Sequence, residues 1–505
     1  MAGSGMKSLA KDTAIYGLSS IVGRIFNWLL VPLHTYIFTD TIEYGKVSYI
    51  YGYTALFMVL LTYGMETGFF RFMNKKEENP DKVYATSLIS LATTSLLFIL
   101  FCFSFINPIS SWMAYTDHKE HIWMMAIVVA LDAFMTIPFA YLRYQKRPIR
   151  FATLKLTFIG FNIFFNLLFL VLCPWLYKNY PDLAINKFFH PEIGIGYIFL
   201  ANLLSSLVVL ILLIPTTMKN VKLQFDNALI RRMLIYSFPL LILGLAGVIN
   251  QTVAQLTYPF LFDNPDEAFS QLGIYNACLK ITVIITMFTQ AFRYAYEPFF
   301  FSKDRENSST KPYADAMKYF VIFALLVFLA VMFYLDILKY IVSKNYTVGT
   351  VIVPIAMMGE IFFGMYFNLS VWYKLTDKTK YGAYFSVFGC ILQVVINIIF
   401  VPIYGYIASA WATLICNLII MSISYFIGQK YYPIRYDLKR IFLYFALAVV
   451  FYIAAMYPQI DNEILRLAYR TVFLVVFTAV IIKKDLPLKE IPVIGKYISN
   501  NKRNK

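Results

Sequence analysis

Long apolar segments recur along almost the whole chain and restrict it to one class of fold. Of its 505 residues, 60% are hydrophobic and 14% are charged, against roughly 25% charged residues in soluble domains. Segments of about 20 apolar residues can cross a bilayer as helices, which satisfy their backbone polar groups internally. We therefore predict an all-α polytopic membrane protein. Its fourteen expected spans lie near residues 12–37, 46–70, 83–106, 121–142, 152–176, 194–217, 234–260, 271–296, 316–338, 349–372, 382–402, 405–427, 441–457 and 465–482.

The basic residues indicate topology and require no nucleic-acid partner. The net charge is +16. With both termini in the cytoplasm, thirty of the 44 lysines and arginines fall in inner connections or the C-terminal tail, and six fall outside. This asymmetry satisfies the positive-inside rule. We therefore expect a multi-pass protein of the cytoplasmic membrane.

The remaining sequence features suggest neither a secretory signal nor a metal centre. Residues 1–5 resemble a cloning remnant ahead of a native Met6, and the first apolar run is too long for a cleavable signal. All five cysteines fall within spans and none forms a CxxC pair, so neither a disulfide framework nor a zinc site is indicated. We expect no cofactor.

Two pairs of similar segments indicate an internal repeat six spans long. Because six is an even number, the copies keep the same orientation, and a pseudo-two-fold axis along the membrane normal relates them. The first pair is residues 164–176 followed by 194–203, with a longer loop between them, and residues 396–415; Asn166 matches Asn397 in it. The second pair is residues 45–72 and 272–299.

The repeat predicts two six-helix lobes with additions. The segment KNVKLQFDNALIRRML, which joins the sixth and seventh spans, has basic and apolar residues at helical spacing and predicts an interfacial linker helix. The expected parts are the remnant 1–5, the N-lobe 6–218, the linker 219–233, the C-lobe 234–428, two C-terminal helices in 429–482, and a basic cytoplasmic tail 483–505.

Arg24 lies about halfway along the first span, where a charge is costly unless it faces protein or water. Its guanidinium keeps its charge and offers a planar fork of donors that suits phosphate. Asn27 and His34 continue the same face of the helix. We predict that Arg24 and Asn27 bind an anionic substrate; the alternative is a structural ion pair with an acid on another helix.

A similar polar stripe in the eighth span places Lys280 near mid-membrane. Arg24 and Lys280 would then lie one in each lobe, where they would clamp a diphosphate. The alternative is that Lys280 pairs with Asp132 in span 4 or Glu360 in span 10. These two acids would either couple transport to protons or sodium ions or neutralise the cations.

Four charged residues lie near the cytoplasmic ends of spans 2 and 8. Arg71 and Arg293 are predicted to contact substrate, and Glu66 and Glu297 to act in gating between the lobes. The alternative is ion pairing at helical spacing, as between Arg293 and Glu297.

Gln251 and Gln255 in span 7 are predicted to bind sugar hydroxyls, as are Gln393 and Asn397 in span 11. Hydrogen bonding between helices is the commoner use of such amides in membranes, and it stays open as the alternative.

Four motifs resemble one superfamily of transporters: GRIFNWLLVP (23–32), GMETGFFRF (64–72), AFRYAYEPFF (291–300) and NIIFVPIYGYIASAWAT (397–413). The chain resembles the multidrug/oligosaccharidyl-lipid/polysaccharide (MOP) exporters, and among them the Wzx-type polysaccharide flippases. The resemblance implies two six-helix lobes, MATE-like or MurJ-like, plus two C-terminal helices. It also implies an undecaprenyl-diphosphate oligosaccharide as cargo, alternating access in a bacterial inner membrane, and a role in cell-surface polysaccharide such as the O-antigen of lipopolysaccharide. Association with polysaccharide polymerase machinery is a further expectation.

Three function classes are compared. Fourteen spans and Arg24 favour the flippase, whereas Asp132 and Glu360 leave open a MATE-type cation-coupled drug exporter, which typically has twelve spans and acidic binding residues. A membrane glycosyltransferase or polymerase would present a large outer loop with acid–base residues, and the sequence contains neither that loop nor a Walker A motif. We therefore expect a transporter and not an enzyme.

Arg24→Ala should abolish transport and leave membrane insertion intact, because the substrate anion loses its partner. Arg24→Lys should restore only part of the activity, since lysine lacks the bidentate fork. The measurement is export of surface glycan by cells that express each variant at the wild-type level. Normal export by a well-expressed Arg24→Ala protein would contradict an anion site in the first span.

Overall fold

The computed structural model describes residues 22–485 apart from 181, 183–188, 218–223 and 304–309. Within these residues the chain is helical and contains no strand. Thirteen helical segments are long and apolar enough to cross a membrane, and each corresponds to one predicted span. A helix of residues 22–37 occupies the place of the first predicted span. The prediction of an all-α polytopic protein with about fourteen spans is confirmed.

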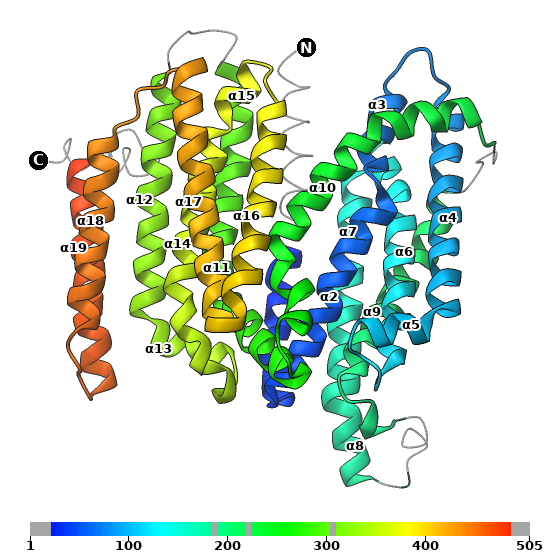
Figure 1. The fold of residues 1–505 in the computed structure, drawn as a ribbon, viewed down its shortest axis with the longest axis horizontal. Helices are drawn as coiled ribbons and strands as arrows, with labels where there is room; N and C mark the ends of the chain where they lie inside the picture. Colours follow the sequence, from blue (N-terminus) through cyan, green and yellow to red (C-terminus); the bar gives the residue numbers. More distant parts are fainter. Residues whose placement is uncertain (1–21, 181, 183–188, 218–223, 304–309, 486–505) are drawn as a thin grey trace, which may run out of the picture. The chain divides into compact units, whose positions relative to one another are not determined.

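The chain forms two compact units, which share α11, α16 and α17 (Figure 1). The first unit holds the described residues up to Lys280 together with 342–350 and 383–412. Its elements are the helix 22–37, α2 (Thr41–Thr62), α3 (Met65–Met73), α4 (Pro80–Ser104), α5 (Ile106–Trp112), α6 (Lys119–Tyr144), α7 (Pro148–Leu167), the π-helical turn η1 (Leu168–Leu172), α8 (Cys173–Asn179), α9 (Gly196–Thr217), α10 (Asn227–Leu261) and the first part of α11 (Pro265–Lys303).

The second unit holds 281–341, 351–382 and the residues from 413 onward. Its helices are the rest of α11, α12 (Lys311–Phe333), α13 (Leu335–Leu338), α14 (Val353–Leu369), α15 (Val371–Leu375), parts of α16 (Lys380–Tyr404) and α17 (Tyr406–Tyr431), α18 (Leu438–Met456) and α19 (Glu463–Lys484).

Local sequence explains where several helices begin and where span 2 bends. Asp40 caps α2 by accepting a hydrogen bond from the Ile42 amide, and Asn79 caps α4 in the same way. Between α2 and α3, Tyr63 and Gly64 both have positive φ angles, 34° and 70°. Glycine adopts this conformation without steric cost, so the span breaks at this point.

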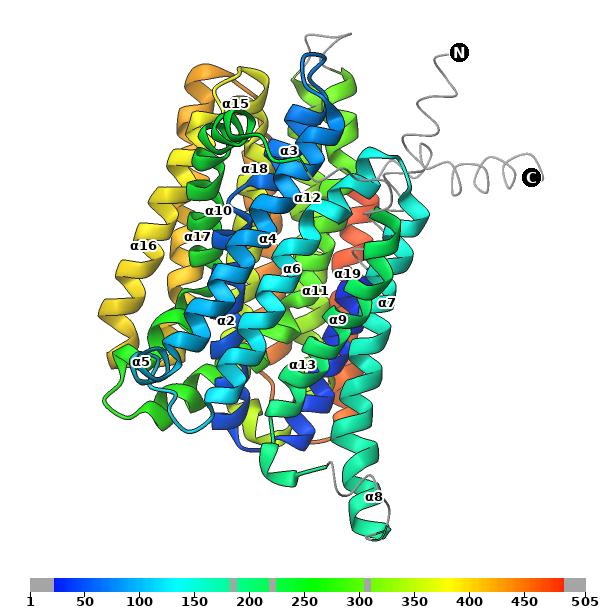
Figure 2. The same ribbon diagram turned by 90° about the vertical axis from the view of Figure 1, so that its right-hand side faces the viewer.

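The first unit packs around α2 and α6. The helix α6 contacts α2, α4 and α9, while α10 lies along α2 and α7 along α9. Figure 2 shows α8 extending beyond the ends of the neighbouring helices of this unit. The predicted linker helix 219–233 lies only partly within the described residues. Its residues 227–233 form the first turns of α10, where Leu229 and Met233 are buried with residues of α3 and α4. The predicted lobe boundaries stay a prediction.

The helices α2 and α11 make a close, reciprocal contact in the first unit. A Cβ on Gly45 would lie 1.8 Å from the carbonyl oxygen of Phe269, and a Cβ on Gly273 would lie 2.0 Å from that of Thr41. Each glycine thus contacts the residue that lies four positions before the other glycine in the sequence. A two-fold relation between two helices produces this pattern. Thr41 and Ser270 hydroxyls lie 2.7 Å apart beside it. We call this contact the α2–α11 seam.

In the second unit, ion pairs fasten the C-terminal helices to their neighbours. The helix α12 packs on α14, α18 and α19. Asp336, just beyond α12, lies 2.9 Å from Arg466 Nε and 2.8 Å from Arg470 Nη1, both on α19. Burial raises the pKa of Asp336, but the two guanidinium groups outweigh it and hold that pKa below its ordinary value. Asp336 is therefore a structural partner of α19.

Gly45→Ala should destabilise the protein, because the new Cβ cannot fit unless α2 and α11 separate. Overpacking of this kind costs about 1–3 kcal/mol. Gly247→Ala is the matched control, since a Cβ on this helical glycine of α10 would have no heavy atom within 4 Å. Thermal unfolding in detergent compares the two variants with the wild type. If Gly45→Ala unfolds at the same temperature as Gly247→Ala, the seam does not constrain the fold.

Candidate functional site

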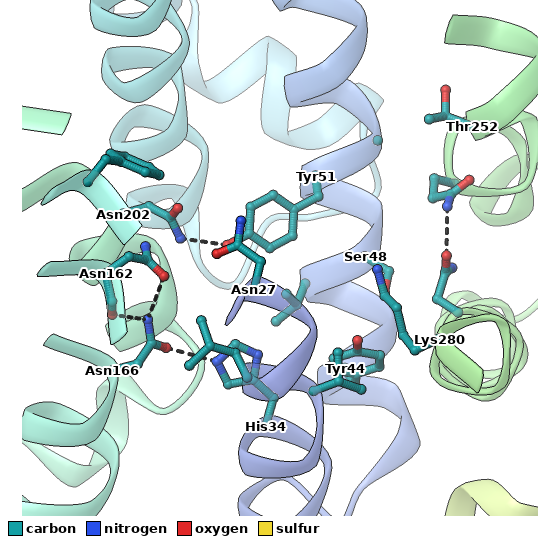
Figure 3. A pocket seen from close by; sticks show the side chains of 17 residues that line it. Asn27, His34, Tyr44, Ser48, Tyr51, Asn162, Asn166, Asn202, Thr252 and Lys280 are labelled. Atoms are coloured by element: carbon teal, nitrogen blue, oxygen red, sulfur yellow. Dashed lines mark hydrogen bonds between the residues drawn. The ribbon is translucent and has the colours of Figure 1, made fainter. Parts of the chain in front are cut away.

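A polar cavity of the first unit has a volume of about 340 Å³. Six helices line it: the helix 22–37, α2, α7, α9, α10 and α11. Figure 3 shows Asn162, Asn166 and Asn202 on one side, Thr252 and Lys280 on the other, and the helix 22–37 with α2 between them. We call this space the amide cavity, because side-chain amides dominate its polar lining. The six are Asn27, Asn162, Asn166, Asn202, Gln255 and Asn276.

A buried hydrogen-bond chain links the first helix to α7. His34 Nε2 lies 2.8 Å from Asn166 Oδ1, and Asn166 Nδ2 donates to the carbonyl oxygen of Asn162 at 2.8 Å. Because Asn166 Oδ1 can only accept, the His34 Nε2 carries the proton and donates it. The amide nitrogen of the Asn162 side chain is buried and has no partner among the described residues. It is a donor available to a ligand.

Two further amide contacts complete the polar lining. Asn202 Nδ2 donates to the Tyr51 hydroxyl at 2.6 Å, and Gln255 Nε2 donates to Asn276 Oδ1 at 2.7 Å. The Gln255 Oε1 atom is buried without a partner among the described residues. The cavity therefore presents at least one free donor and one free acceptor, the combination that a sugar hydroxyl can satisfy.

Lys280 gives the amide cavity its one strongly basic side chain, and no carboxylate of the described residues lines the cavity. Among the described residues, no carboxylate oxygen lies close enough to Lys280 to form a salt bridge, for which the limit is 4 Å. Asp132 instead accepts a hydrogen bond from Ser206 at 3.0 Å. The predicted pairing of Lys280 with Asp132 is thus not formed. At the same level, Trp28 Nε1 donates to the Lys280 carbonyl oxygen at 2.7 Å and joins the first helix to α11.

A second cavity of the same unit, of about 320 Å³, holds charges of both signs. Glu66 of α3 forms an ion pair with Arg143 of α6 at its wall. Asp132 and Lys155 face the same space, and the Lys155 ammonium lies 4.2 Å from the centre of the Phe139 ring. We call it the charged cavity. Its acids have basic neighbours, unlike an open site for a cation.

The structure brings together some of the predicted site residues. Asn27, Gln255 and Lys280 line the amide cavity, while Glu66 and Asp132 line the charged cavity. Each of the two groupings combines residues from different predicted spans.

The other predicted residues of the first unit lie outside both cavities. Arg24 is exposed one turn before Asn27, and Gln251 is exposed one turn before Gln255. Arg71 stacks 4.0 Å over the Tyr236 ring.

In the second unit, Arg293 stacks 4.5 Å over the Phe367 ring. Glu360 on α14 is half-buried and forms no salt bridge with another described residue. The side chain of Glu297 lies outside the described residues.

Gln393 and Asn397 line neither cavity. Asn397 Nδ2 donates to the Gln393 carbonyl oxygen at 2.7 Å, and the Ser409 hydroxyl donates to Asn397 Oδ1. The bond from Ser409 joins α17 to α16, which is the alternative use of such amides. Asn166 makes the same i to i−4 contact, so the two asparagines matched in the repeat share this local bond, although their other partners are His34 for Asn166 and Ser409 for Asn397.

Sequence reasoning missed Asn162, Asn166, Asn202 and Tyr51 as site residues. Asn162 and Asn166 are four residues apart and therefore share one helix face, which was the available signal. Nothing in the sequence distinguishes Asn202 from an amide that bonds two helices, because its position facing Tyr51 depends on how α9 packs.

Comparison with known proteins identifies the family. The model of the family described as polysaccharide biosynthesis protein matches residues 9–302, which is more than half of the chain. The chain belongs to this family. No curated protein matches the sequence. Family membership confirms the resemblance to MOP exporters of the flippase type.

Solved structures share the fold of this polysaccharide biosynthesis protein at low sequence identity. A lipid II flippase, MurJ, in an inward closed conformation has a TM-score of 0.69 at 16% identity, over 92% of this chain and 99% of that one. An inward-facing multidrug resistance MATE transporter of the MOP superfamily has 0.61 at 14% identity, over 83% and 94%. The MATE multidrug transporter DinF-BH has 0.57 at 13% identity, over 86% and 96%. The family and the fold are those of membrane transporters, which are not enzymes.

Proposed function

We propose that the protein is a flippase that moves a lipid-linked oligosaccharide, an undecaprenyl-diphosphate sugar, across the cytoplasmic membrane. The observation that carries the proposal is the amide cavity, which joins six amides and Lys280 and has no carboxylate of the described residues in its lining. Amides bind sugar hydroxyls as both donors and acceptors, and an ammonium group binds phosphate. Family membership supports the same cargo class.

The size of the amide cavity fits part of such a cargo. A volume of about 340 Å³ holds a headgroup portion of one or two sugars and not a long polyprenyl chain. The tail would therefore stay in the lipid, and the protein needs a lateral opening. We place this opening beside the first and eighth spans, where the hydrogen bond from Trp28 to the Lys280 carbonyl oxygen would have to break.

Alternating access requires that one end of the transport path close while the other opens. The α2–α11 seam supplies a close contact of the required kind, because two glycines and two hydroxyls meet there. Its opening would separate the two segments matched by the repeat. We propose this seam as the closed end of the path, toward the outer face if both termini are cytoplasmic.

Coupling to protons or sodium ions is assigned to the charged cavity. Asp132 lies there with Lys155, and the hydroxyl of Ser206 donates to its carboxylate. Phe158 of α7 lines both the charged and the amide cavity. Binding of an ion in the charged cavity would therefore act on the wall of the amide cavity through this side chain. Delivery of the glycan to polymerase machinery for O-antigen or a related surface polysaccharide would follow.

A MATE-type drug exporter is the second candidate, and the shared fold of two MATE structures favours it. A cationic drug needs a free carboxylate. In the charged cavity Glu66 is already paired with Arg143, and Asp132 shares the cavity with Lys155 and accepts a hydrogen bond from Ser206. Among the described residues the amide cavity has no acid. The chemistry of both cavities thus supports the flippase over the exporter.

Lys280→Met should lower glycan export about 10- to 100-fold, since a charge-assisted hydrogen bond contributes about 1.5–3 kcal/mol. Lys280→Arg should keep a substantial part of the activity because it retains the charge. The assay measures surface glycan and the lipid-linked intermediate that accumulates inside. Lys344→Met, at an exposed position, serves as the control and should export normally. Equal export by Lys280→Met and the control would contradict phosphate binding at Lys280.

A further inference from the structure

Three side chains with metal-ligand chemistry meet where α6 begins, away from both cavities. His118 Nδ1 lies 2.9 Å from Glu120 Oε1, and His121 Nε2 lies 4.0 Å from the same oxygen. One ligand atom from each residue lies within 4.8 Å of the others. Ligand atoms of a tetrahedral zinc ion, each about 2.0–2.1 Å from the metal, are separated by roughly 3.3 Å. Side-chain rotations that bring the three atoms closer by up to about 1.5 Å would therefore place them on one ion.

The inner ligand has an unsatisfied nitrogen that points to a missing partner. The His121 side chain is 0% exposed, and its Nε2 has no hydrogen-bond partner among the described residues. Buried polar atoms nearly always have one. A Cβ on Gly196 would lie 2.7 Å from this nitrogen, so any larger residue at this position of α9 would block it.

The second nitrogen of His121 is held by Tyr115. The Tyr115 hydroxyl lies 2.7 Å from His121 Nδ1. When Nδ1–H donates to that oxygen, Nε2 presents a lone pair, which is the form of imidazole that binds a metal. The ring of His118 stacks on that of His121 with centroids 4.9 Å apart and 15° between the planes. To bind an ion that lies in the plane of the His121 ring, the His118 ring would have to tilt out of this stack.

Access to the site is open on one side. The side chains of His118 and Glu120 are 36% and 44% exposed, so an ion that meets them first would reach the buried His121 nitrogen when these two side chains move. Tyr115 also packs edge-on against Phe269, whose carbonyl oxygen faces Gly45 in the α2–α11 seam. An ion at this position would stabilise the loop before α6, which packs against the α2–α11 seam through Tyr115.

We propose that His118, Glu120 and His121 bind a divalent zinc ion, with water as the fourth ligand. Two imidazoles and one carboxylate are a donor set of zinc, whereas magnesium and calcium require oxygen ligands. The cysteines gave no indication of zinc, and this site uses none of them. It is independent of the cargo, so its test and the test of the flippase can fail separately.

Zinc binding is measured on the full chain without a polyhistidine tag, purified in detergent and stripped with a chelator. Equilibrium dialysis against zinc should give one ion per wild-type chain, with a rise in the midpoint of thermal unfolding. His118→Ala and Glu120→Gln should lose this stoichiometric binding. His190→Ala is the matched control, because His190 lies 3.4 Å from Glu192 without a second histidine among the described residues, and it should bind as the wild type does.

Two further measurements keep the proposal testable if a ligand variant folds poorly. Tyr115→Phe retains all three ligands and should weaken zinc binding about 10- to 100-fold, as the loss of a hydrogen-bond partner of a metal ligand does. X-ray absorption of the loaded wild type should show nitrogen ligands at about 2.0–2.1 Å. Equal zinc binding by the wild type and His118→Ala, or a coordination shell of oxygen alone, would overturn the site.

Discussion

The approach of Gly45 to Phe269 and of Gly273 to Thr41 is the constraint on which the polar architecture of the first unit depends. It allows α2 and α11 to pack backbone against backbone. The same two helices continue into the amide cavity, where α2 contributes Tyr51 and α11 contributes Asn276 and Lys280. Any larger residue in the seam would move these groups apart. Packing at one end of α2 and α11 thus sets the spacing of the functional groups along them.

Polar side chains in the first unit are collected into two cavities with different chemistry. In lipid, an unpaired polar group is costly, and amides of the amide cavity accordingly bond to a backbone carbonyl oxygen, to the Tyr51 hydroxyl and to another amide. The atoms without a partner among the described residues, on Asn162 and Gln255, are candidates for contact with sugar hydroxyls. The charged cavity instead places its acids beside bases. This separation supports a division between cargo binding and ion coupling.

The fold was predictable from sequence because each span had a clear apolar pattern, whereas the orientation indicated by the charge asymmetry stays a prediction. Asn27 and Lys280 were predicted from polar stripes on single helices, and both line the amide cavity. The roles of Asn202 and of the seam glycines were not predicted, because the sequence does not show which helices become neighbours. The zinc proposal had a local sequence signal in His118 and His121, but the unsatisfied nitrogen became visible only once α9 was placed beside it.

The most direct test of the central claim is translocation by the purified protein in liposomes. Fluorescently labelled undecaprenyl-diphosphate oligosaccharide is placed in one leaflet, and its appearance in the other is followed with a membrane-impermeant quencher. The account predicts movement of the lipid-linked sugar that requires the protein and is inhibited by an excess of unlabelled lipid-linked sugar. Protein that leaves this lipid in its original leaflet, yet transports a water-soluble organic cation, would contradict it.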